Sequence, residues 1–341
     1  MPHDQAYLHA EKKIEQARRS SATELNLGNM GLAELPESLE QLTQLQSLNL
    51  SNNLLHSWQL PKILEQLTQL QLLYLSDNLF TTLPESLGNL TQLQSLDLGK
   101  NQLRTLPEWL CNLKQLQELN LASIPSTALP EWLGNLKQLK SLNLSNNQLM
   151  ALPEWLGNLR HLKSLNLSNN QLMALPEWFE QLVQLQKLNL ARTQLTSLPE
   201  SIGQLVQLQE LNLSQSELRS LPESIGQCLQ LNELQLNGNQ LRDLPGSLTK
   251  TDIFSKWGWN YHLEDNPFNP ELARAYEQGI DAFKAYLRAK AIGGQVILNE
   301  AKLILIGEGE VGKTCLLGAL RDEPFVEGLP STHGIEIQSF N

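Results

Sequence analysis

Residues 139–158 read LKSLNLSNNQLMALPEWLGN, and 23 residues later the chain reads LKSLNLSNNQLMALPEWFEQ. Leucines alternate with polar residues over Ser141–Ser145, which predicts a short strand with its leucines in a core and its polar residues facing out. The next segment, LPEWLGNL at 152–159, returns across the opposite side and adds further core leucines. One such unit cannot bury its leucines alone, so neighbouring copies must stack.

The centre of this unit, LxxLxLxxN, recurs at a spacing of 23 residues, with one gap of 25. Its copies begin at Leu45, Leu70, Leu93, Leu116, Leu139, Leu162, Leu185, Leu208 and Leu231. A degenerate first copy starts at Ala22, and a last copy follows an insertion after Pro245. The pattern predicts about eleven turns of a leucine-rich-repeat solenoid, an α/β horseshoe over residues 22–268.

Helices are expected to cover both ends of the stack. Residues 1–21 carry apolar residues at helical spacing and basic residues near their end, which predicts an N-terminal capping helix. Residues 269–300 are predicted to form a C-terminal capping helix and a linker. Within them, 269–290 is interpreted as one helix, with Asn269 as its N-cap and Pro270 at its first position.

An asparagine closes most copies of the repeat. The column consists of Asn53, Asn78, Asn101, Asn147, Asn170, Asn239 and Asn266. A buried amide at this position satisfies backbone groups of the turn, so we interpret the column as structural. Ile124, Thr193 and Ser216 interrupt it, and we expect those turns to be slightly looser.

A protein partner is the default expectation for the surface of such a solenoid, although its identity is not encoded in a recognisable motif. On the concave face, Leu72 and Tyr74 are the only side-by-side pair that offers an aromatic anchor. The convex side carries a tryptophan row at 23-residue spacing, Trp109, Trp132, Trp155 and Trp178. We interpret this row as a cover over the convex backbone, and a docking patch is the alternative.

Composition narrows the class of partner. The formal net charge of −11 argues against nucleic acid or an anionic membrane as the main partner. The apolar run at Leu303–Ile306 is too short to span a bilayer, and the N-terminal 20 residues do not resemble a secretory signal. Cys111, Cys228 and Cys315 show no paired spacing, so reduced thiols and a cytoplasmic location are expected.

A second motif lies near the C-terminal end, where the apolar run AKLILIG at 301–307 predicts a buried strand. The loop that follows matches GxxxxGK[ST], and a helix is expected to begin after it. The predicted nucleotide-binding residues are Gly307, Glu308, Gly309, Glu310, Val311, Gly312, Lys313, Thr314 and Cys315. Glycines let backbone N–H groups approach phosphates, Lys313 would reach the β- and γ-phosphates, and Thr314 would hold Mg²⁺.

Thr332 lies 19 residues after Lys313 and precedes an alternating segment, Gly334–Gln338, that predicts a strand. In small GTP-binding proteins a threonine of this kind closes over the γ-phosphate and Mg²⁺. Thr332 is therefore a second candidate metal ligand. An ordinary loop residue is the alternative.

In this order of parts the chain resembles the Roco family, in which leucine-rich repeats precede a Ras-like GTP-binding Roc domain. The resemblance rests on the repeats at 22–266, the linker at 269–300, GEGEVGKT at 307–314 and THGI at 332–335. It implies a cytoplasmic guanine-nucleotide switch that uses GTP, GDP and Mg²⁺. It also implies dimerisation through a COR domain that follows Roc in the family.

The chain departs from the family because residues 301–341 carry only the first strand, helix and strand of a P-loop GTPase domain. The DxxG segment and the guanine-reading NKxD segment are missing, and so is COR. We therefore expect residues after about 300 to be poorly ordered or out of native context, assign no catalytic residue, and expect no GTP hydrolysis by this stretch alone. Alternatives are a plain leucine-rich-repeat binding module, or an ATP-using STAND-type NTPase, which the domain order and THGI disfavour.

Overall fold

The structure is a computed structural model that describes residues 5–57, 60–125, 129–251, 253, 262–292, 303–304 and 337–338. The chain divides into two compact units, Met1–Ala291 and Ile292–Asn341.

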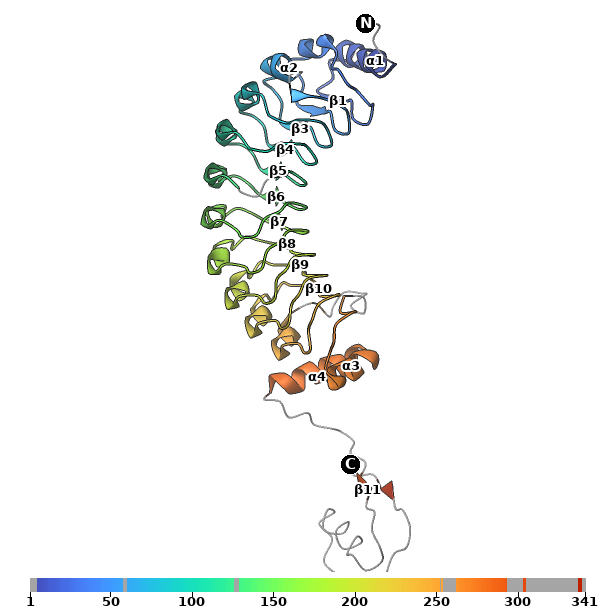
Figure 1. Cartoon of the computed structure of the whole chain (residues 1–341), viewed down its shortest axis with the longest axis vertical. Helices are drawn as coiled ribbons and strands as arrows, with labels where there is room; N and C mark the ends of the chain where they lie inside the picture. The colour runs from blue at the N-terminus through green and yellow to red at the C-terminus, as the bar shows by residue number, and fades with distance from the viewer. Residues whose placement is uncertain are drawn as a thin grey trace, which may run out of the picture. The chain divides into compact units, whose positions relative to one another are not determined.

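A parallel sheet runs through the first unit, with its ten strands in sequence order (Figure 1). The strands are β1 Glu24–Asn26, β2 Ser47–Asn49, β3 Leu72–Tyr74, β4 Ser95–Asp97, β5 Glu118–Asn120, β6 Ser141–Asn143, β7 Ser164–Asn166, β8 Lys187–Asn189, β9 Glu210–Asn212 and β10 Glu233–Gln235. Each residue pairs with its equivalent in the next repeat, as Ser141 pairs with Ser164. Identical repeat positions therefore form straight rows across the sheet.

The strands are shorter than the five residues predicted at Ser141–Ser145. Strand β6 covers Ser141–Asn143, although Leu144 still donates its amide to the carbonyl of Asn166 (2.8 Å). The ladder stops because the chain then turns through a left-handed residue, Asn146, with φ of 54°. An equivalent left-handed residue follows each of the ten strands, and Gly238 supplies it after β10.

The convex side is built mainly from five-residue 3-10 helices (Figure 1). They are η1 Glu37–Gln41, η3 Glu85–Asn89, η4 Glu108–Asn112, η5 Glu131–Asn135, η6 Glu154–Asn158, η7 Glu177–Gln181, η8 Glu200–Gln204, η9 Glu223–Gln227 and η10 Gly246–Lys250. A proline precedes each helix, which fixes the entering backbone and costs no helical hydrogen bond. In the second repeat, the α-helix α2, Leu60–Gln66, replaces the 3-10 turn.

One continuous leucine core lies between the strands and the convex helices. Leu142 and Leu144 from one repeat, and Leu139 from the turn before them, are each no more than 1% exposed. Phe80 and Phe179 are the largest side chains that replace leucine in this stack, and both are fully buried. The predicted inward orientation of the repeat leucines is confirmed.

The N-terminal cap is helix α1, Gln5–Arg19, as the apolar spacing predicted. Its buried face consists of Ala10, Ile14 and Ala17, which join the leucine core. Arg18 and Arg19 lie in its last turn, where the helix dipole stabilises positive charge. The helix covers leucines of the first repeat that would otherwise face solvent.

The C-terminal cap corrects a prediction, because residues 270–291 form two helices and not one. Helix α3 covers Pro270–Glu277 and helix α4 covers Ile280–Ala291. The break falls at Gly279, whose φ of 103° lies outside the range that suits residues with a side chain. Asn269 is the N-cap as predicted, since its Oδ1 accepts the amides of Glu271 and Leu272 (3.0 and 2.8 Å).

In its described residues, the predicted eleventh turn of the solenoid contains no strand, but its backbone forms hydrogen bonds with the tenth turn in the same way as in the other repeats. Leu236 donates its amide to the carbonyl of His262 (2.7 Å), and Gly238 donates to that of Glu264 (2.9 Å). The insertion before this turn, residues 254–261, falls outside the described residues.

In the second unit the structure describes two short strands. Strands β11, Leu303–Ile304, and β12, Ile337–Gln338, pair antiparallel, with Ile304 opposite Ile337. Both lie inside segments that the sequence predicts as strands. The expectation of poor order after residue 300 concerns residues that otherwise lie outside the described part of the chain.

Candidate functional site

The predicted nucleotide-binding residues, 307–315, and the candidate metal ligand Thr332 lie outside the described residues. The nearest described elements are β11, which ends three residues before Gly307, and β12, which begins five residues after Thr332. The assignments of phosphate and Mg²⁺ contacts therefore stay predictions from sequence.

The concave face of the repeats holds a hollow of about 260 Å³ across β7–β10. We call it the concave hollow; its lining residues are Ser164, Leu165, Asn166, Lys187, Leu188, Asn189, Glu210, Leu211, Asn212, Glu233 and Gln235. All come from strands, so a stacked sheet positions them. The hollow is shallow and polar, which suits the side chains of a protein partner better than a small apolar ligand.

Charge in the concave hollow is organised around one ion pair. Nζ of Lys187 lies 2.7 Å from Oε1 of Glu210 on the next strand, and this hydrogen bond together with the carboxylate charge raises the pKa of Lys187. Glu233, one strand further, carries a second carboxylate and accepts a hydrogen bond from Gln235 (2.8 Å). Two carboxylates face one ammonium group, so the hollow has an excess of negative charge.

The concave asparagines are mostly occupied with their own backbone. In eight repeats the third strand residue accepts the amide of the residue two positions later at 2.9–3.0 Å: Asn26, Asn49, Asp97, Asn120, Asn143, Asn166, Asn189 and Asn212. These side chains therefore shape the turn after each strand. Tyr74 takes this position in β3 and lies on the same strand face as Leu72, both half-buried, as the predicted aromatic pair requires.

The second asparagine column is structural, as predicted. Nδ2 of Asn170 donates to the carbonyls of Leu144 (2.9 Å) and Leu167 (2.8 Å), and its Oδ1 accepts the amide of Leu149 (3.0 Å). One amide thus ties two successive repeats together. Asn170 is only 5% exposed, so these backbone groups have no access to water in its place.

The interruptions of this column differ from one another. Thr193 donates to the carbonyl of Leu190 (2.9 Å), and its hydroxyl lies 3.1 Å from that of Ser216. Two hydroxyl groups therefore replace part of the amide pattern, so the expected loosening is partly compensated there. Ile124 has an apolar side chain and provides no such hydrogen bond, yet it is buried in the leucine core.

The tryptophan row favours the structural interpretation over a docking patch. The four indoles are partly buried and pack against the leucine core. A Cβ on Gly88 would lie 3.1 Å from Cε3 of Trp109, and one on Gly134 would lie 3.3 Å from Cβ of Trp155. Trp109, Trp155 and Trp178 thus pack on a glycine of the preceding convex element, and Cys111 takes the place of this glycine before Trp132.

Serine takes the tryptophan position in other repeats, and there it has no ring to cover the convex backbone. The hydroxyls of Ser86, Ser201, Ser224 and Ser247 are buried, and within the described residues they have no hydrogen-bond partner. The repeats of Ser224 and Ser247 pack more closely, since a Cβ on Gly203 would lie 2.6 Å from the carbonyl oxygen of Ser224, and one on Gly226 would lie 2.5 Å from that of Ser247. Close backbone approach thus replaces the indole cover at the cost of unsatisfied hydroxyls.

A further row was not singled out from the sequence. It occupies the turn that leads from each 3-10 helix into the next strand, on the flank between the convex and concave faces. We call it the flank row: Lys114, Lys137, Arg160, Val183, Val206 and Leu229. All six side chains are exposed, and the three apolar ones are 48%, 48% and 62% exposed. Its signal in the sequence is the same 23-residue spacing that defines the core.

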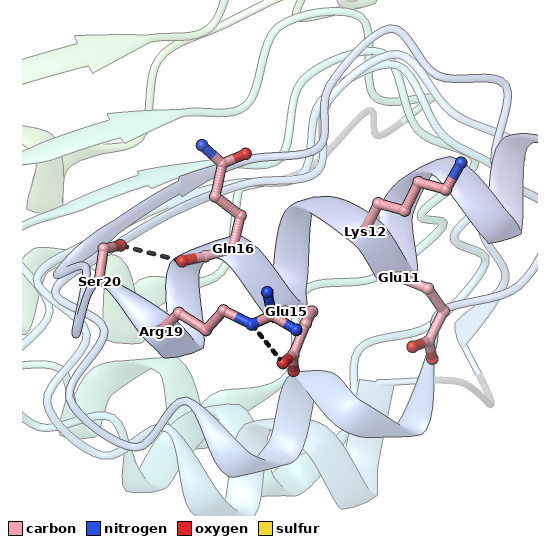
Figure 2. A pocket seen from close by; sticks show the side chains of 6 residues that line it. All are labelled: Glu11, Lys12, Glu15, Gln16, Arg19 and Ser20. Carbon is pink, nitrogen blue, oxygen red and sulfur yellow. Dashed lines mark hydrogen bonds and ion pairs between the residues drawn. The ribbon is translucent and has the colours of Figure 1, made fainter.

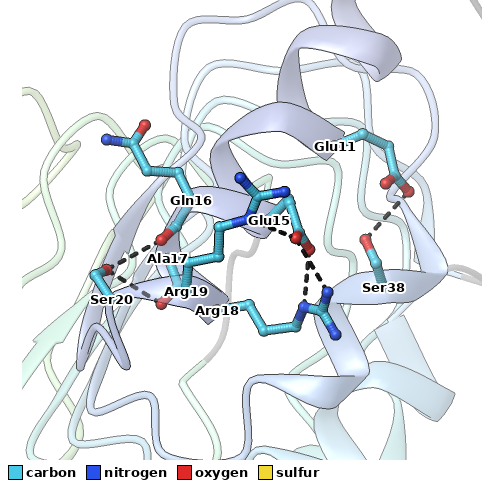
Figure 3. Close-up of polar contacts among 8 residues, drawn as sticks. All are labelled: Glu11, Glu15, Gln16, Ala17, Arg18, Arg19, Ser20 and Ser38. Carbon is cyan, nitrogen blue, oxygen red and sulfur yellow. Dashed lines mark hydrogen bonds and ion pairs between the residues drawn. The ribbon is translucent and has the colours of Figure 1, made fainter.

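The outer face of α1 carries a shallow depression of about 650 Å³ lined by Glu11, Lys12, Glu15, Gln16, Arg19 and Ser20 (Figure 2). Glu15 accepts hydrogen bonds from Arg18 and Arg19 at 2.8 Å each, and Ser38 donates to Glu11 at 3.1 Å (Figure 3). The lining residues belong to α1 and to Ser20, which follows it directly, so the depression is the outer surface of the cap, not an enclosed site.

The described part of the chain contains no group of His, Cys, Asp and Glu side chains that could hold a metal ion. Among its helices, none is long and apolar enough to cross a bilayer. Burial raises the pKa of the Cys228 thiol to about 11, which makes a poor nucleophile at neutral pH.

Comparisons with known proteins identify the repeats. Family profiles for leucine-rich repeats match residues 44–67, and the profile for a leucine-rich repeat region matches 62–148. Another leucine-rich-repeat profile matches 127–172, 152–195 and 183–241. Residues 44–241 are thus leucine-rich repeats. No curated protein sequence matches the chain.

Among solved structures, an internalin (InlF) of Listeria monocytogenes is similar, with a TM-score of 0.61 and 21% identity over 79% of this chain and 84% of that chain. A leucine-rich-repeat protein of Leptospira interrogans aligns with a TM-score of 0.42 and 26% identity, over 77% of this chain and 96% of that chain. The likeness to the internalin shows that the two proteins share the solenoid fold.

Proposed function

We propose that the repeats form a protein-binding scaffold joined to a Roc-type GTP-binding switch, as in the Roco family, in a cytoplasmic signalling protein. The observation that carries the scaffold role is the long polar sheet with its concave hollow. Leucine-rich repeats in general mediate contacts between proteins, and solenoids offer extended binding surfaces of this kind.

The chemistry of the concave hollow favours a partner that presents a basic side chain. Glu210 forms an ion pair with Lys187, whereas Glu233 forms a hydrogen bond with the neutral amide of Gln235 and interacts with the Lys187 charge without an ion pair. An arginine or lysine of a partner would therefore gain a charge-assisted hydrogen bond at Glu233. The row of neighbouring concave residues would fix its register.

The GTP-binding part of the proposal is supported by sequence. The loop at 307–314 and Thr332 have the residue types and spacing of a phosphate and Mg²⁺ site, and β11 precedes the loop as the motif requires. In the complete switch, Lys313 would contact the phosphates, and Thr314 with Thr332 would hold Mg²⁺. Dimerisation through a COR domain belongs to the same proposal.

The scaffold role is tested by cross-linking the full chain to its partners in a cell lysate and quantifying them by mass spectrometry. Glu210→Lys and Glu233→Lys reverse charge in the concave hollow, whereas Glu154→Lys makes the same change on the exposed convex side. Partners that are lost with both concave variants and kept with the convex control support the role. Partner sets that are identical for all variants contradict it.

The nucleotide role is tested separately by measuring Mg²⁺-dependent binding of GTP, GDP and ATP to the purified chain, with Lys313→Ala as the matched variant. Guanine-nucleotide binding that disappears in Lys313→Ala supports a Roc-type switch. A preference for ATP favours the STAND-type alternative. Binding that is unchanged in Lys313→Ala contradicts the assigned phosphate contact.

A further inference from the structure

The flank row changes chemistry along its length. Its first three members, Lys114, Lys137 and Arg160, are basic, and its last three are Val183, Val206 and Leu229. Each member follows a buried residue that closes the 3-10 helix, leucine in five repeats and Cys228 before Leu229. The amide of this residue donates to a carbonyl of the helix, as Leu113 does to Leu110 (3.1 Å). The same turn in every repeat therefore presents the six side chains in one line.

The basic half of this flank is unusual for an acidic chain. Residues 111–170 contain five basic and three acidic residues, whereas the whole chain contains 25 and 36. Lys140 and Lys163 are also basic and exposed, and each directly precedes a strand, β6 or β7. Within the described residues none of these five cations forms an ion pair, and Lys140 instead donates to the side-chain oxygen of Gln117 (2.9 Å).

The three carboxylates of this stretch lie elsewhere. Glu118 belongs to β5 on the concave face and accepts a hydrogen bond from Ser95 (3.2 Å). Glu131 and Glu154 begin convex 3-10 helices, at the opposite end of the helix from the flank row. The fold thus separates the cations from the acidic groups, so the positive potential of the flank is not cancelled locally.

Hollows accompany both ends of the flank row. One of about 530 Å³ is lined by Thr91, Gln92, Gln94, Asn112, Lys114 and Gln115. The other, of about 590 Å³, is lined by Gln209, Leu229, Gln230, Asn232, Lys250 and Thr251. Both are grooves between successive repeats with polar groups in their walls, so a bound chain would find hydrogen-bonding partners beside the row.

We propose that the flank row binds an extended protein segment that has an acidic stretch next to an apolar stretch. With about 4.8 Å between strands, the six positions span about 24 Å, the length of roughly seven extended residues. Carboxylates would lie over Lys114, Lys137 and Arg160, and apolar side chains over Val183, Val206 and Leu229. Charge complementarity selects an acidic partner, and the apolar half favours a protein over a phosphate polymer.

This inference rests on the proposed scaffold role only in taking a protein as partner, and it concerns a surface separate from the concave hollow. The test uses the full chain and a fluorescein-labelled peptide of four glutamates followed by four leucines. Fluorescence anisotropy measures its affinity, with a peptide of four glutamines and four leucines for comparison. The acidic peptide is expected to bind more tightly, and added salt is expected to weaken it.

Variants locate the binding. Lys137→Glu with Arg160→Glu is expected to weaken the acidic peptide by about tenfold or more, and Val206→Ser with Leu229→Ser by about threefold. The matched control, Arg104→Glu with Arg219→Glu, reverses two exposed cations on the opposite flank and is expected to change affinity less than about twofold. All changed side chains are exposed, so folding is retained.

Several results would overturn the inference. These are the absence of saturable peptide binding up to about 1 mM, equal weakening by flank and control variants, or tighter flank-dependent binding of an RNA oligonucleotide or phosphatidylserine vesicles. A dimer in light scattering that Lys137→Glu with Arg160→Glu dissociates would assign the row to a second copy of the chain and would also overturn it. Partner capture that depends on Glu210 tests the scaffold role independently of each of these results.

Discussion

Tyr286, in helix α4, donates a hydrogen bond from its hydroxyl to Oδ1 of Asp243 in the last regular repeat (3.1 Å). The same hydroxyl accepts a hydrogen bond from Nδ2 of Asn269, the N-cap of α3 (3.2 Å). Lys290 forms an ion pair with Oδ2 of Asp243. A small polar network therefore joins both C-terminal helices to the end of the repeat stack.

Removal of the bridging hydroxyl is expected to loosen this cap. Tyr286→Phe leaves the aromatic ring in place but deletes both hydrogen bonds, so the free energy of unfolding of the cap should fall by about 1–2 kcal/mol. Native-state hydrogen exchange of the α3 and α4 amides measures this loss. Arg288→Ala, an exposed change in the same helix, should cost less than about 0.5 kcal/mol. Equal protection in the two variants would show that the network is not stabilising.

The asparagine column makes a graded prediction. Asn170→Ala leaves the carbonyl of Leu167 and the amide of Leu149 without their side-chain partner, whereas the carbonyl of Leu144 keeps Asn147, so it should cost about 2–4 kcal/mol in urea unfolding. Asn170→Thr should cost about half as much, because Thr193 shows that a hydroxyl at this position still reaches the carbonyl three residues earlier. A threonine variant as unstable as the alanine variant would contradict this role for the hydroxyl.

The buried serines predict a stabilising substitution. Ser224 is 9% exposed and its hydroxyl has no partner in the described structure, so Ser224→Ala should raise the free energy of unfolding by about 0.5–1 kcal/mol. Thr193→Val removes a hydroxyl that does have partners, at 2.9 and 3.1 Å, and should lower it by about 1 kcal/mol. Chemical denaturation of both variants gives the comparison. A loss of stability in Ser224→Ala would mean that the hydroxyl is satisfied in solution.

The N-terminal helix predicts a pH dependence. Hydrogen bonds from Arg18 and then Arg19 lower the pKa of the Glu15 carboxyl from 4.5 to about 2. Because the folded pKa lies below the ordinary one, this contribution to stability is fully present above about pH 4.5 and is lost as the pH falls towards 2. The Glu15 side chain is 37% exposed, so salt should screen the effect.

An NMR titration of Glu15 follows this directly. Arg18→Gln should move its midpoint upwards towards the ordinary value, since Arg18 is the larger cause of the lowered pKa. Lys12→Gln removes a cation from the same helix that does not contact Glu15 and serves as the control. An upward shift of equal size in both variants would point to general charge, not to the Arg18 hydrogen bond.

The periodic features could be predicted in detail because each repeats a local rule. Leucines at fixed spacing must be buried for any copy to be stable, which fixed the inward face of every strand, and Ala10, Ile14 and Ala17 fixed the buried face of α1 in the same way. The five-residue strand was too long because the sequence pattern does not report the left-handed turn at Asn146. That turn ends the ladder earlier than the alternation of leucines does.

The single C-terminal helix was wrong for a tertiary reason. Residues 269–290 have continuous helical spacing, but Gly279 permits a break that brings α4 against the last 3-10 helix. This contact is so close that it requires glycine at position 246, since a Cβ there would lie 2.6 Å from the backbone nitrogen of Ala291. Two glycines far apart in sequence act together, and neither alone predicts the packing.

The sequence by itself determined the solenoid, its core, its asparagine column and its N-terminal cap, because a 23-residue period constrains each of them locally. It also supplied the nucleotide-binding motif at 307–314, which stays a prediction. Only the tertiary structure decided what the surfaces offer. Stacking aligned Lys187 with Glu210 and turned the concave asparagines towards their own backbone. It also placed basic and apolar turns in one flank row, since residues 23 apart become neighbours only when the repeats pack.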